Sequence, residues 1–279
     1  MRRAVALVIA AVALAGCTST PTAPPTAGTA SWILTKAALD AVTANPQARA
    51  RLAGTRIFEI LKGNEKPSTT VPVVPTLSFK SVATLQQTLD ARTPQRRGVR
   101  AIIYDAEHWA QTPADEQRDP AGAYQRAATI AHAHGLIFIA TPAMDLVNTT
   151  GRVSDPASVF LSRGIDGDAA KYADVVDIQA QSLERDTAAY QDFVVRATAQ
   201  IRSANQGVTV IAGLSTNPHG WVITPDMLVS DMTAVAGSVS GFWLNIPDQG
   251  PDCADCATPR PDVAVGALTD GRLGTLFGG

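Results

Sequence analysis

The feature that most constrains the fold is a regular alternation of short apolar segments with longer amphipathic ones. The short segments are rich in β-branched residues and predict strands, and the longer ones carry apolar residues at helical spacing. Strands that alternate with helices favour a parallel sheet covered by helices. Seven strands are countable, and an eighth is possible at either end. The predicted strands are residues 56–61, 71–79, 99–104, 136–140, 175–181, 208–212 and 241–246, and the short apolar run at 32–34 could be a further strand.

The helical segments carry recognisable start and stop signals. Ser81 is placed to cap one helix, and Pro120 follows Asp119 at the first position of another, which ends at Gly135. Residues 149–172 are expected to hold a short helix near 156–163 and a Gly/Asp-rich loop, and the Pro259–Pro261 stretch is expected to be a loop. The predicted helices are residues 37–53 with a possible break at Pro46, 81–91, 120–134, 156–163, 186–203 and 225–236.

This pattern predicts a single-domain α/β fold, a TIM-like (β/α)8 barrel over residues 31–279. A chain of 279 residues that is 46% apolar can bury one large core of this kind. The alternative is an open, doubly wound parallel sheet. No Gly-x-Gly-x-x-Gly sequence or P-loop follows any predicted strand, so a nucleotide-binding version of that sheet would lack its phosphate cradle.

The N-terminal segment is not expected to belong to the barrel. Arg2 and Arg3 precede an apolar run that is too short for a permanent membrane helix of roughly 20 residues, which is typical of a signal peptide. The run ends in Leu14-Ala-Gly-Cys17, which resembles the lipobox of bacterial lipoproteins. That resemblance implies cleavage after residue 16 and a lipid on Cys17; the alternative is ordinary signal cleavage nearby, with Cys17 discarded or left free.

A lipid anchor would place the chain on the extracytoplasmic face of the cell membrane. Acyl chains contribute about 0.8 kcal/mol per buried methylene, so two or three would hold a soluble domain there. Residues 17–30 are rich in Thr, Pro and Ala and are expected to form a disordered tether. The formal net charge of −2 gives no reason to expect nucleic acid as a partner. The sequence leaves the oligomeric state open.

Two further cysteines, Cys253 and Cys256, are spaced as C-x-x-C. In an exported protein, the expected state of such a pair is a disulfide. A redox-active pair would belong at a strand-to-helix junction, and a zinc site would need two more ligands. The neighbouring prolines favour a loop, and hence a structural disulfide.

The stretch with the most chemical content is the end of the predicted strand at residues 99–104. Because side chains alternate along a strand, Ile103, Asp105 and Glu107 would share one side. In a parallel barrel, catalytic groups lie at the carboxyl ends of the strands. We therefore take Asp105 and Glu107 as the candidate catalytic residues.

Other strand ends carry polar or aromatic residues where packing alone would favour Val or Ile. Amides and acids bind hydroxyl groups, and indoles stack on the C–H faces of sugars, so the set suits a carbohydrate. The alternative is a hydrogen-bonded polar plug at the top of the barrel. The candidate binding residues are Trp109, Asp145, Asn148, Gln179, Gln181, Asn217, Trp243 and Asn245.

The segment Tyr104-Asp-Ala-Glu107 resembles the end of the chitinase-type glycosidase motif D-x-x-D-x-D-x-E. Asp105 and Glu107 match its last two acids, whereas Arg100 and Ile103 stand where the first two would be. The resemblance implies sugar binding or substrate-assisted hydrolysis at these two carboxylates. The whole chain more generally resembles exported actinobacterial lipoproteins with a glycosidase-like barrel.

Three functions remain open at this point. The first is a glycoside hydrolase in which Glu107 is the acid/base, without a cofactor. The second is a non-catalytic barrel that binds a cell-envelope glycan or another polar ligand. The third is a metal-dependent hydrolase built on Asp105, Glu107, His108 and Asp145.

Several other polar residues have open or structural interpretations. Glu59 is either a partner carboxylate from another strand or a buried polar group. The run Asp115, Glu116 and Asp119 is expected to be a solvated, helix-starting segment. His132 is expected to complement a helix dipole, and His219 lies in a loop at the same end as the candidate site.

Overall fold

The structure is a computed structural model that describes residues 30–91, 98–250, 256 and 258–275. The predicted signal peptide (1–16), Cys17, nearly all of the predicted tether and Cys253 lie outside these residues. The lipid anchor and the Cys253–Cys256 disulfide therefore stay predictions. Within the described part of the chain, no helix is both long and apolar enough to cross a membrane.

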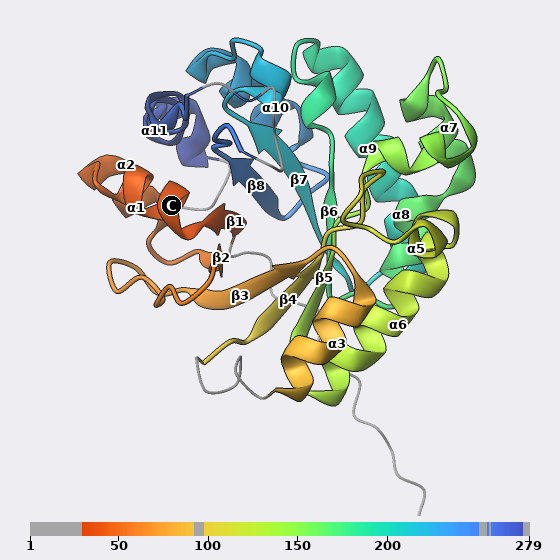
Figure 1. Cartoon of the computed structure of the whole chain (residues 1–279). Helices are drawn as coiled ribbons and strands as arrows, with labels where there is room; N and C mark the ends of the chain where they lie inside the picture. The colour runs from red at the N-terminus through yellow and green to blue at the C-terminus, as the bar shows by residue number, and fades with distance from the viewer. Residues whose placement is uncertain (1–29, 92–97, 251–255, 257, 276–279) are drawn as a thin grey trace, which may run out of the picture.

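Eight parallel strands close into a barrel in the order of the sequence, and β1 completes the ring by pairing with β8 (Figure 1). This confirms the predicted TIM-like fold. It also places the eighth strand at the N-terminal end of the domain. The strands are β1 Ser31–Thr35, β2 Arg56–Ile60, β3 Val74–Phe79, β4 Ala101–Tyr104, β5 Ile137–Ala140, β6 Val175–Ile178, β7 Thr209–Ser215 and β8 Gly241–Asn245.

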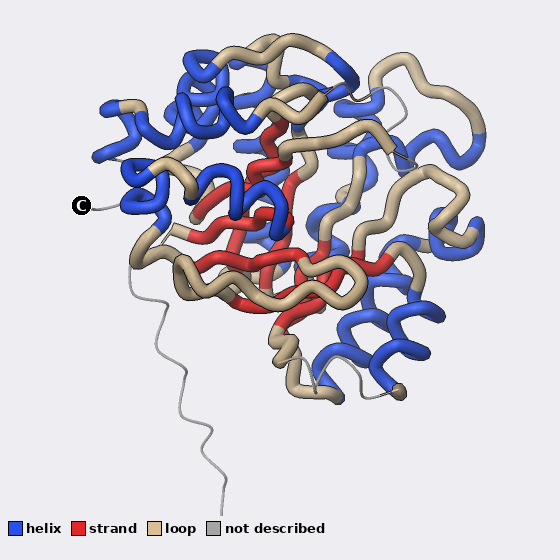
Figure 2. Tube along the Cα trace, turned by 60° about the vertical axis from the view of Figure 1, so that its left-hand side comes forward, coloured by secondary structure: helices blue, strands red, loops and turns tan. Residues whose placement is uncertain are grey.

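Helices surround the strands on the outside (Figure 2). The C-terminal helix α11 packs against α10 on one side and against α1 and α2 on the other, which closes the helical layer where the barrel closes. The α-helices are α1 Lys36–Thr43, α2 Pro46–Leu52, α3 Val82–Asp90, α5 Ala114–Arg118, α6 Pro120–Ala133, α7 Pro156–Arg163, α8 Ile165–Ala170, α9 Thr187–Ala204, α10 Pro225–Val235 and α11 Pro261–Thr269. The 3-10 helices are η1 Met144–Thr150, η2 Gln181–Leu183, η3 Pro218–Gly220 and η4 Gly271–Thr275.

Four of these helices begin in the same way, at a short polar residue followed directly by proline. The polar side chain accepts a hydrogen bond from a free N–H of the first turn, and proline has no N–H there to satisfy. The caps are Asn45 of α2, Asp119 of α6, Asp155 of α7 and Thr224 of α10.

The strands separate two hydrophobic cores. The outer core lies between the strands and the helices. The inner core fills the barrel with one or two side chains from each of several strands, including Ile33, Phe58, Ile103, Ile139 and Ile211. Residues that alternate with the inner core along each strand therefore face the helices, which fixes the side on which each polar side chain lies.

Two predicted loops contain helices instead. Residues 165–170 form α8, because Gly164 adopts the left-handed conformation (φ 65°) that ends α7 and lets a new helix begin at once. Pro261 is the first residue of α11 rather than part of a loop. The buried face of α11 includes Val263 and Leu268.

The acidic run after Thr112 is only partly solvated, which corrects the prediction. Asp119 caps α6 and Asp115 is exposed, but Glu116 is buried. The Glu116 carboxylate accepts hydrogen bonds from the Tyr104 hydroxyl (2.5 Å) and from the Val82 N–H (3.1 Å) at the start of α3. Glu116 thus joins α5 to β4 and α3 from the helix side of the barrel.

Candidate functional site

The centre of the candidate site is Asp105, which follows β4 on the same face as Ile103 and so lies at the mouth of the barrel. Its Oδ1 accepts hydrogen bonds from Thr141 Oγ1 (2.9 Å) and from Gln179 Nε2 (3.0 Å). The same Gln179 amide group also donates to the Thr141 carbonyl (2.8 Å). Three consecutive strand ends, β4 to β6, therefore hold one carboxylate in place.

Glu107 lies in a turn just beyond Asp105 and is half-buried. The Thr112 hydroxyl oxygen accepts from the Glu107 N–H (3.3 Å) and from Trp109 Nε1 (2.8 Å), so both residues are held by one side chain. Lys80 Nζ, from the end of β3, lies 3.9 Å from the centre of the Trp109 ring. Both candidate catalytic residues thus lie in the segment that follows β4, which ends at Tyr104.

Asp145 joins the turn after β4 to the loop after β5. Its Oδ1 accepts from the His108 N–H (2.9 Å). Burial raises the pKa of the Asp145 carboxyl, while the His108 N–H and the nearby His108 and His219 rings act in the opposite direction. Asp145 therefore belongs to the same mouth as Asp105, and its hydrogen bond joins the loops after β4 and β5.

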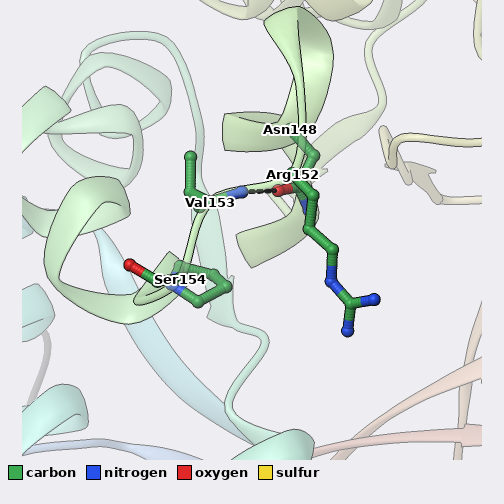
Figure 3. Close-up of a pocket in the computed structure, with 5 residues that line it drawn as sticks. Asn148, Arg152, Val153 and Ser154 are labelled. Carbon is green, nitrogen blue, oxygen red and sulfur yellow. Dashed lines mark hydrogen bonds between the residues drawn. The ribbon is translucent and has the colours of Figure 1, made fainter.

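Asn148 has a more local role than predicted. Its Oδ1 accepts from the Val153 N–H (3.0 Å) and closes the turn after η1 (Figure 3). The residue lines a hollow of about 560 Å³, together with Arg152, Val153, Ser154 and Pro156. Arg152 extends away from this turn, as Figure 3 shows.

Gln179 and Gln181 were expected on one strand face, but β6 ends at Ile178 and Gln181 begins η2. The Gln181 side chain instead lies against Gly213 of β7, where an added Cβ would come within 2.5 Å of its Nε2. Glycine at position 213 therefore provides the space in which the Gln181 amide lies. The two glutamines reach the mouth from different elements.

Trp243 is on the inner face of β8, on the opposite side of the ring from β4. It is half-buried against the inner core, and no described residue accepts a hydrogen bond from its Nε1. Asn245, two residues on, is half-buried at the end of β8 and pairs with Ser215 of β7. Trp243 and Asn245 thus face Asp105 across the mouth.

Asn217 follows β7 and is almost completely buried. Its Oδ1 accepts from the Thr216 hydroxyl (3.0 Å), but across the described ranges its Nδ2 has no hydrogen-bond partner. A buried amide without a partner costs free energy, so the position is suited to a donor that a ligand or a water molecule completes.

Sequence reasoning missed one polar group inside the barrel, Asp177 on β6. Asp177 lies two residues after Val175 of the inner core, so its side chain shares the inward face and is fully buried. Neither carboxyl oxygen finds a hydrogen-bond partner among the residues described, and burial, then the Asp105 and Asp166 charges, raise its pKa well above the usual value. The sequence feature that could have identified Asp177 is an acidic residue in the middle of the apolar run Val-Val-Asp-Ile.

Glu59 does not take part in the mouth. It alternates with Phe58 and Ile60 of the inner core, so it faces outward, where it accepts from the Ser68 N–H (2.9 Å). It is therefore a buried polar group of the outer layer. His132, at the other end of the barrel, pairs with Asp174 (3.0 Å).

A metal centre finds no support in the geometry. Among the described residues, no group of three or more His, Cys, Asp or Glu side chains is arranged to hold a metal ion. The side chains that donate hydrogen bonds to Asp105 include a threonine and a glutamine.

Comparison with known proteins extends the result for the fold. No family model and no curated protein sequence matches the chain. Among solved structures, a chitinase from Chromobacterium violaceum is 12% identical with a TM-score of 0.50, and the match covers 88% of this chain and 99% of the chitinase.

A putative α-L-fucosidase from Bacteroides thetaiotaomicron is 11% identical with a TM-score of 0.53, with 89% and 95% of the two chains covered. The spore cortex-lytic enzyme SleL from Bacillus megaterium is 10% identical with a TM-score of 0.50, with 88% and 75% covered. At such identities the likeness shows the fold. Fold and site together define a (β/α)8-barrel protein with a polar, aromatic mouth.

Proposed function

We propose that the barrel mouth binds a carbohydrate and hydrolyses a glycosidic bond. The observation that carries this proposal is the arrangement at the end of β4, where Asp105 is held by Thr141 and Gln179, and Glu107 follows two residues on. Trp243 lies across the mouth as a surface for a sugar ring. The similar folds of the chitinase, fucosidase and SleL structures support the proposal, because the names of these proteins describe enzymes that act on chitin, on fucosides or on the spore cortex.

Each residue has a distinct task in this proposal. Glu107, half-exposed at the rim, donates a proton to the leaving oxygen and later accepts one from water. Asp105 is fixed by two donors and stabilises positive charge that develops on the sugar or its substituent. Asn245 and the Gln181 amide offer hydrogen bonds to hydroxyl groups, and the Trp109 and Trp243 rings offer apolar faces.

The test is the release of new reducing ends from a panel of cell-wall and storage polysaccharides. We expect release by the wild type and none by Glu107→Gln, which removes the proton donor but keeps the shape. The matched control is Asp192→Asn, which removes a carboxylate from the exposed face of α9 and should release reducing ends at the wild-type rate. Equal release by wild type and Glu107→Gln would overturn the assignment of the acid.

A second candidate is a non-catalytic glycan-binding barrel. It is favoured by one observation: Arg100 and Ile103 stand where the chitinase-type motif has its first two acids, and Ile103 belongs to the apolar inner core. Saturable binding that survives Glu107→Gln, without release of reducing ends, would select this candidate.

We also propose that the chain is a lipoprotein held at the extracytoplasmic face of the membrane by a lipid on Cys17. The Leu14-Ala-Gly-Cys17 sequence after an apolar run supports this proposal. Mass spectrometry of the N-terminal peptide should show a diacylglycerol on Cys17. The Cys17→Ser variant should move from the membrane fraction to the soluble fraction, and an unmodified wild-type peptide would contradict the proposal.

A further inference from the structure

Beyond the Asp105 centre, the rim of the mouth carries an aromatic ring stacked with a cation. Trp221, in the loop after β7, is half-exposed. The Arg185 guanidinium, from the segment after β6, lies 4.9 Å from the centre of the Trp221 ring. A guanidinium stacked on an aromatic face keeps its N–H groups at the edge, where they remain available to a ligand.

The charge of Arg185 is not neutralised by its sequence neighbours. Glu184 is buried and accepts a hydrogen bond from the Ser215 N–H, and Asp186 caps α9. In the parts of the chain that the structure covers, Arg185 forms no ion pair. Arg152 in the neighbouring loop after β5 is likewise unpaired among the described residues, so this part of the rim presents two free positive charges.

His219 completes the cluster with an unusual backbone. Its φ of 50° places a non-glycine residue in the left-handed region, which costs free energy and often marks a functional position. In that conformation the imidazole lies against the Trp221 ring, with 5.8 Å between the ring centres. The three side chains Arg185, His219 and Trp221 are called the rim cluster below.

The rim cluster is connected to the candidate active site. His219 follows β7 and Asp145 follows β5, so both lie at the carboxyl ends of the strands, and Asp145 accepts the N–H of His108, the residue after Glu107. Asn217, two residues before His219, has the buried Nδ2 that lacks a partner among the described residues. A saccharide that extends from Glu107 along this side would meet the rim cluster next.

We propose that the rim cluster is a second saccharide subsite that selects a sugar unit carrying a carboxylate. This inference rests on the proposed carbohydrate function and deepens it. Arg185 carries a permanent positive charge and the Trp221 indole offers an N–H donor, which matches an acceptor with a negative charge. The Trp221 ring provides a face for the sugar, and the Arg185 fork provides two parallel N–H bonds to the carboxylate.

The experiment measures by calorimetry how tightly the full chain binds each member of two matched pairs of oligosaccharides. One pair is a β-1,4-glucose oligomer and the same oligomer oxidised at C6 to glucuronate. The other is an N-acetylglucosamine oligomer and its counterpart in which alternate sugars bear a lactyl ether carboxylate. The variants are Arg185→Gln, Trp221→Leu and, as a matched control, Arg163→Gln, which removes an exposed arginine at the end of α7.

We expect the acidic member of at least one pair to bind about tenfold more tightly than its neutral counterpart at low salt. Arg185→Gln should remove this preference by lowering the affinity for the acidic member about tenfold, Trp221→Leu should weaken both members, and Arg163→Gln should change neither. High salt should also remove the preference. Hydrolysis is not needed for any of these results.

The inference is overturned if acidic and neutral members bind equally, or if Arg185→Gln weakens both alike. In that case the proposed function stands, because saccharides still bind. If no saccharide of either kind binds, the carbohydrate function fails together with the inference. If acidic oligomers bind but release no reducing ends, the rim cluster stands and only the hydrolytic activity is lost.

Discussion

The barrel mouth and the barrel interior differ in the hydrogen-bond partners that they give to a carboxyl group. At the mouth, Asp105 is buried and accepts two side-chain hydrogen bonds, from Thr141 and Gln179. In the interior, Asp177 is fully buried, and its oxygens lack hydrogen-bond partners within the described residues. The carboxyl group at the mouth is held by hydrogen-bond donors, whereas burial raises the pKa of the Asp177 carboxyl inside the barrel and favours its neutral form. The predictions below test this difference.

The largest effect is expected from Asp177→Asn. Burial raises the pKa of the Asp177 carboxyl, so the folded chain keeps a proton that the unfolded chain releases above about pH 4. Wild-type stability should therefore fall as the pH rises from 4 towards the raised pKa, by about 1.4 kcal/mol per pH unit for each such group. The asparagine variant should lack this pH-dependent loss. Its free energy of unfolding should therefore rise relative to that of the wild type between pH 5 and pH 7.

Urea unfolding at several pH values measures this slope. Asp166 and Glu184 also have pKa values raised by burial and should keep part of the slope in the variant. The exposed Asp192→Asn variant should run parallel to the wild type. If the free energy of unfolding of Asp177→Asn had the same pH dependence as that of the wild type, Asp177 would have to be ionised and paired in solution.

The next effect is expected from Gln179→Leu at the mouth. The change removes one of the two side-chain donors to Asp105 and the bond to the Thr141 carbonyl. Loss of a hydrogen bond to a charged group should lower the free energy of unfolding by about 2 kcal/mol. The change should also reduce the rate of hydrolysis. If stability is unchanged in urea unfolding, the fixed charge at the mouth is not maintained by Gln179.

A smaller effect is expected from Gly213→Ala, which tests whether Gln181 belongs to the mouth. The added Cβ would displace the Gln181 amide and should cost about 1 kcal/mol through the forced shift. Saccharide binding should weaken as well. The control is Gly237→Ala, where a Cβ meets nothing within 4 Å, and both stability and binding should be kept. Equal binding by the two variants would remove Gln181 from the site.

The smallest effect on stability is expected from Trp243→Phe. The Trp243 Nε1 has no acceptor within the described ranges, so the change loses no hydrogen bond, and the smaller ring should lower the free energy of unfolding by less than about 1 kcal/mol through reduced packing on the inner core. Binding of a saccharide should nevertheless weaken. A large loss of stability with normal binding would assign the indole to packing alone.

The sequence predicted the barrel because its periodicity is local. Segments such as Ile137–Ala140, and caps such as Asp119 before Pro120, specify their own structure. The C-terminal helix at Pro261 was missed because a proline signals a loop as readily as a helix start. Glu116 was placed in solvent because its partners, Tyr104 and Val82, are distant in the sequence.

The site was predictable to the extent that it lies at strand ends. Asp105 and Gln179 were both identified, and the structure joins them by a hydrogen bond. Asp177 was missed because a strand in isolation does not show which face turns inward. Gln181 was assigned to the same strand as Gln179 because the end of β6 at Ile178 depends on pairing with its neighbours.

The most direct test of the account is to observe the indole N–H signals of the four tryptophans by NMR while an oligosaccharide pool is titrated. Assignment uses a Trp→Phe variant at each of Trp32, Trp109, Trp221 and Trp243. The account predicts saturable shifts for Trp243 and Trp109, and none for Trp32, which packs in the outer core. Shifts confined to Trp32, or no shift with any oligosaccharide, would contradict a carbohydrate site at the barrel mouth.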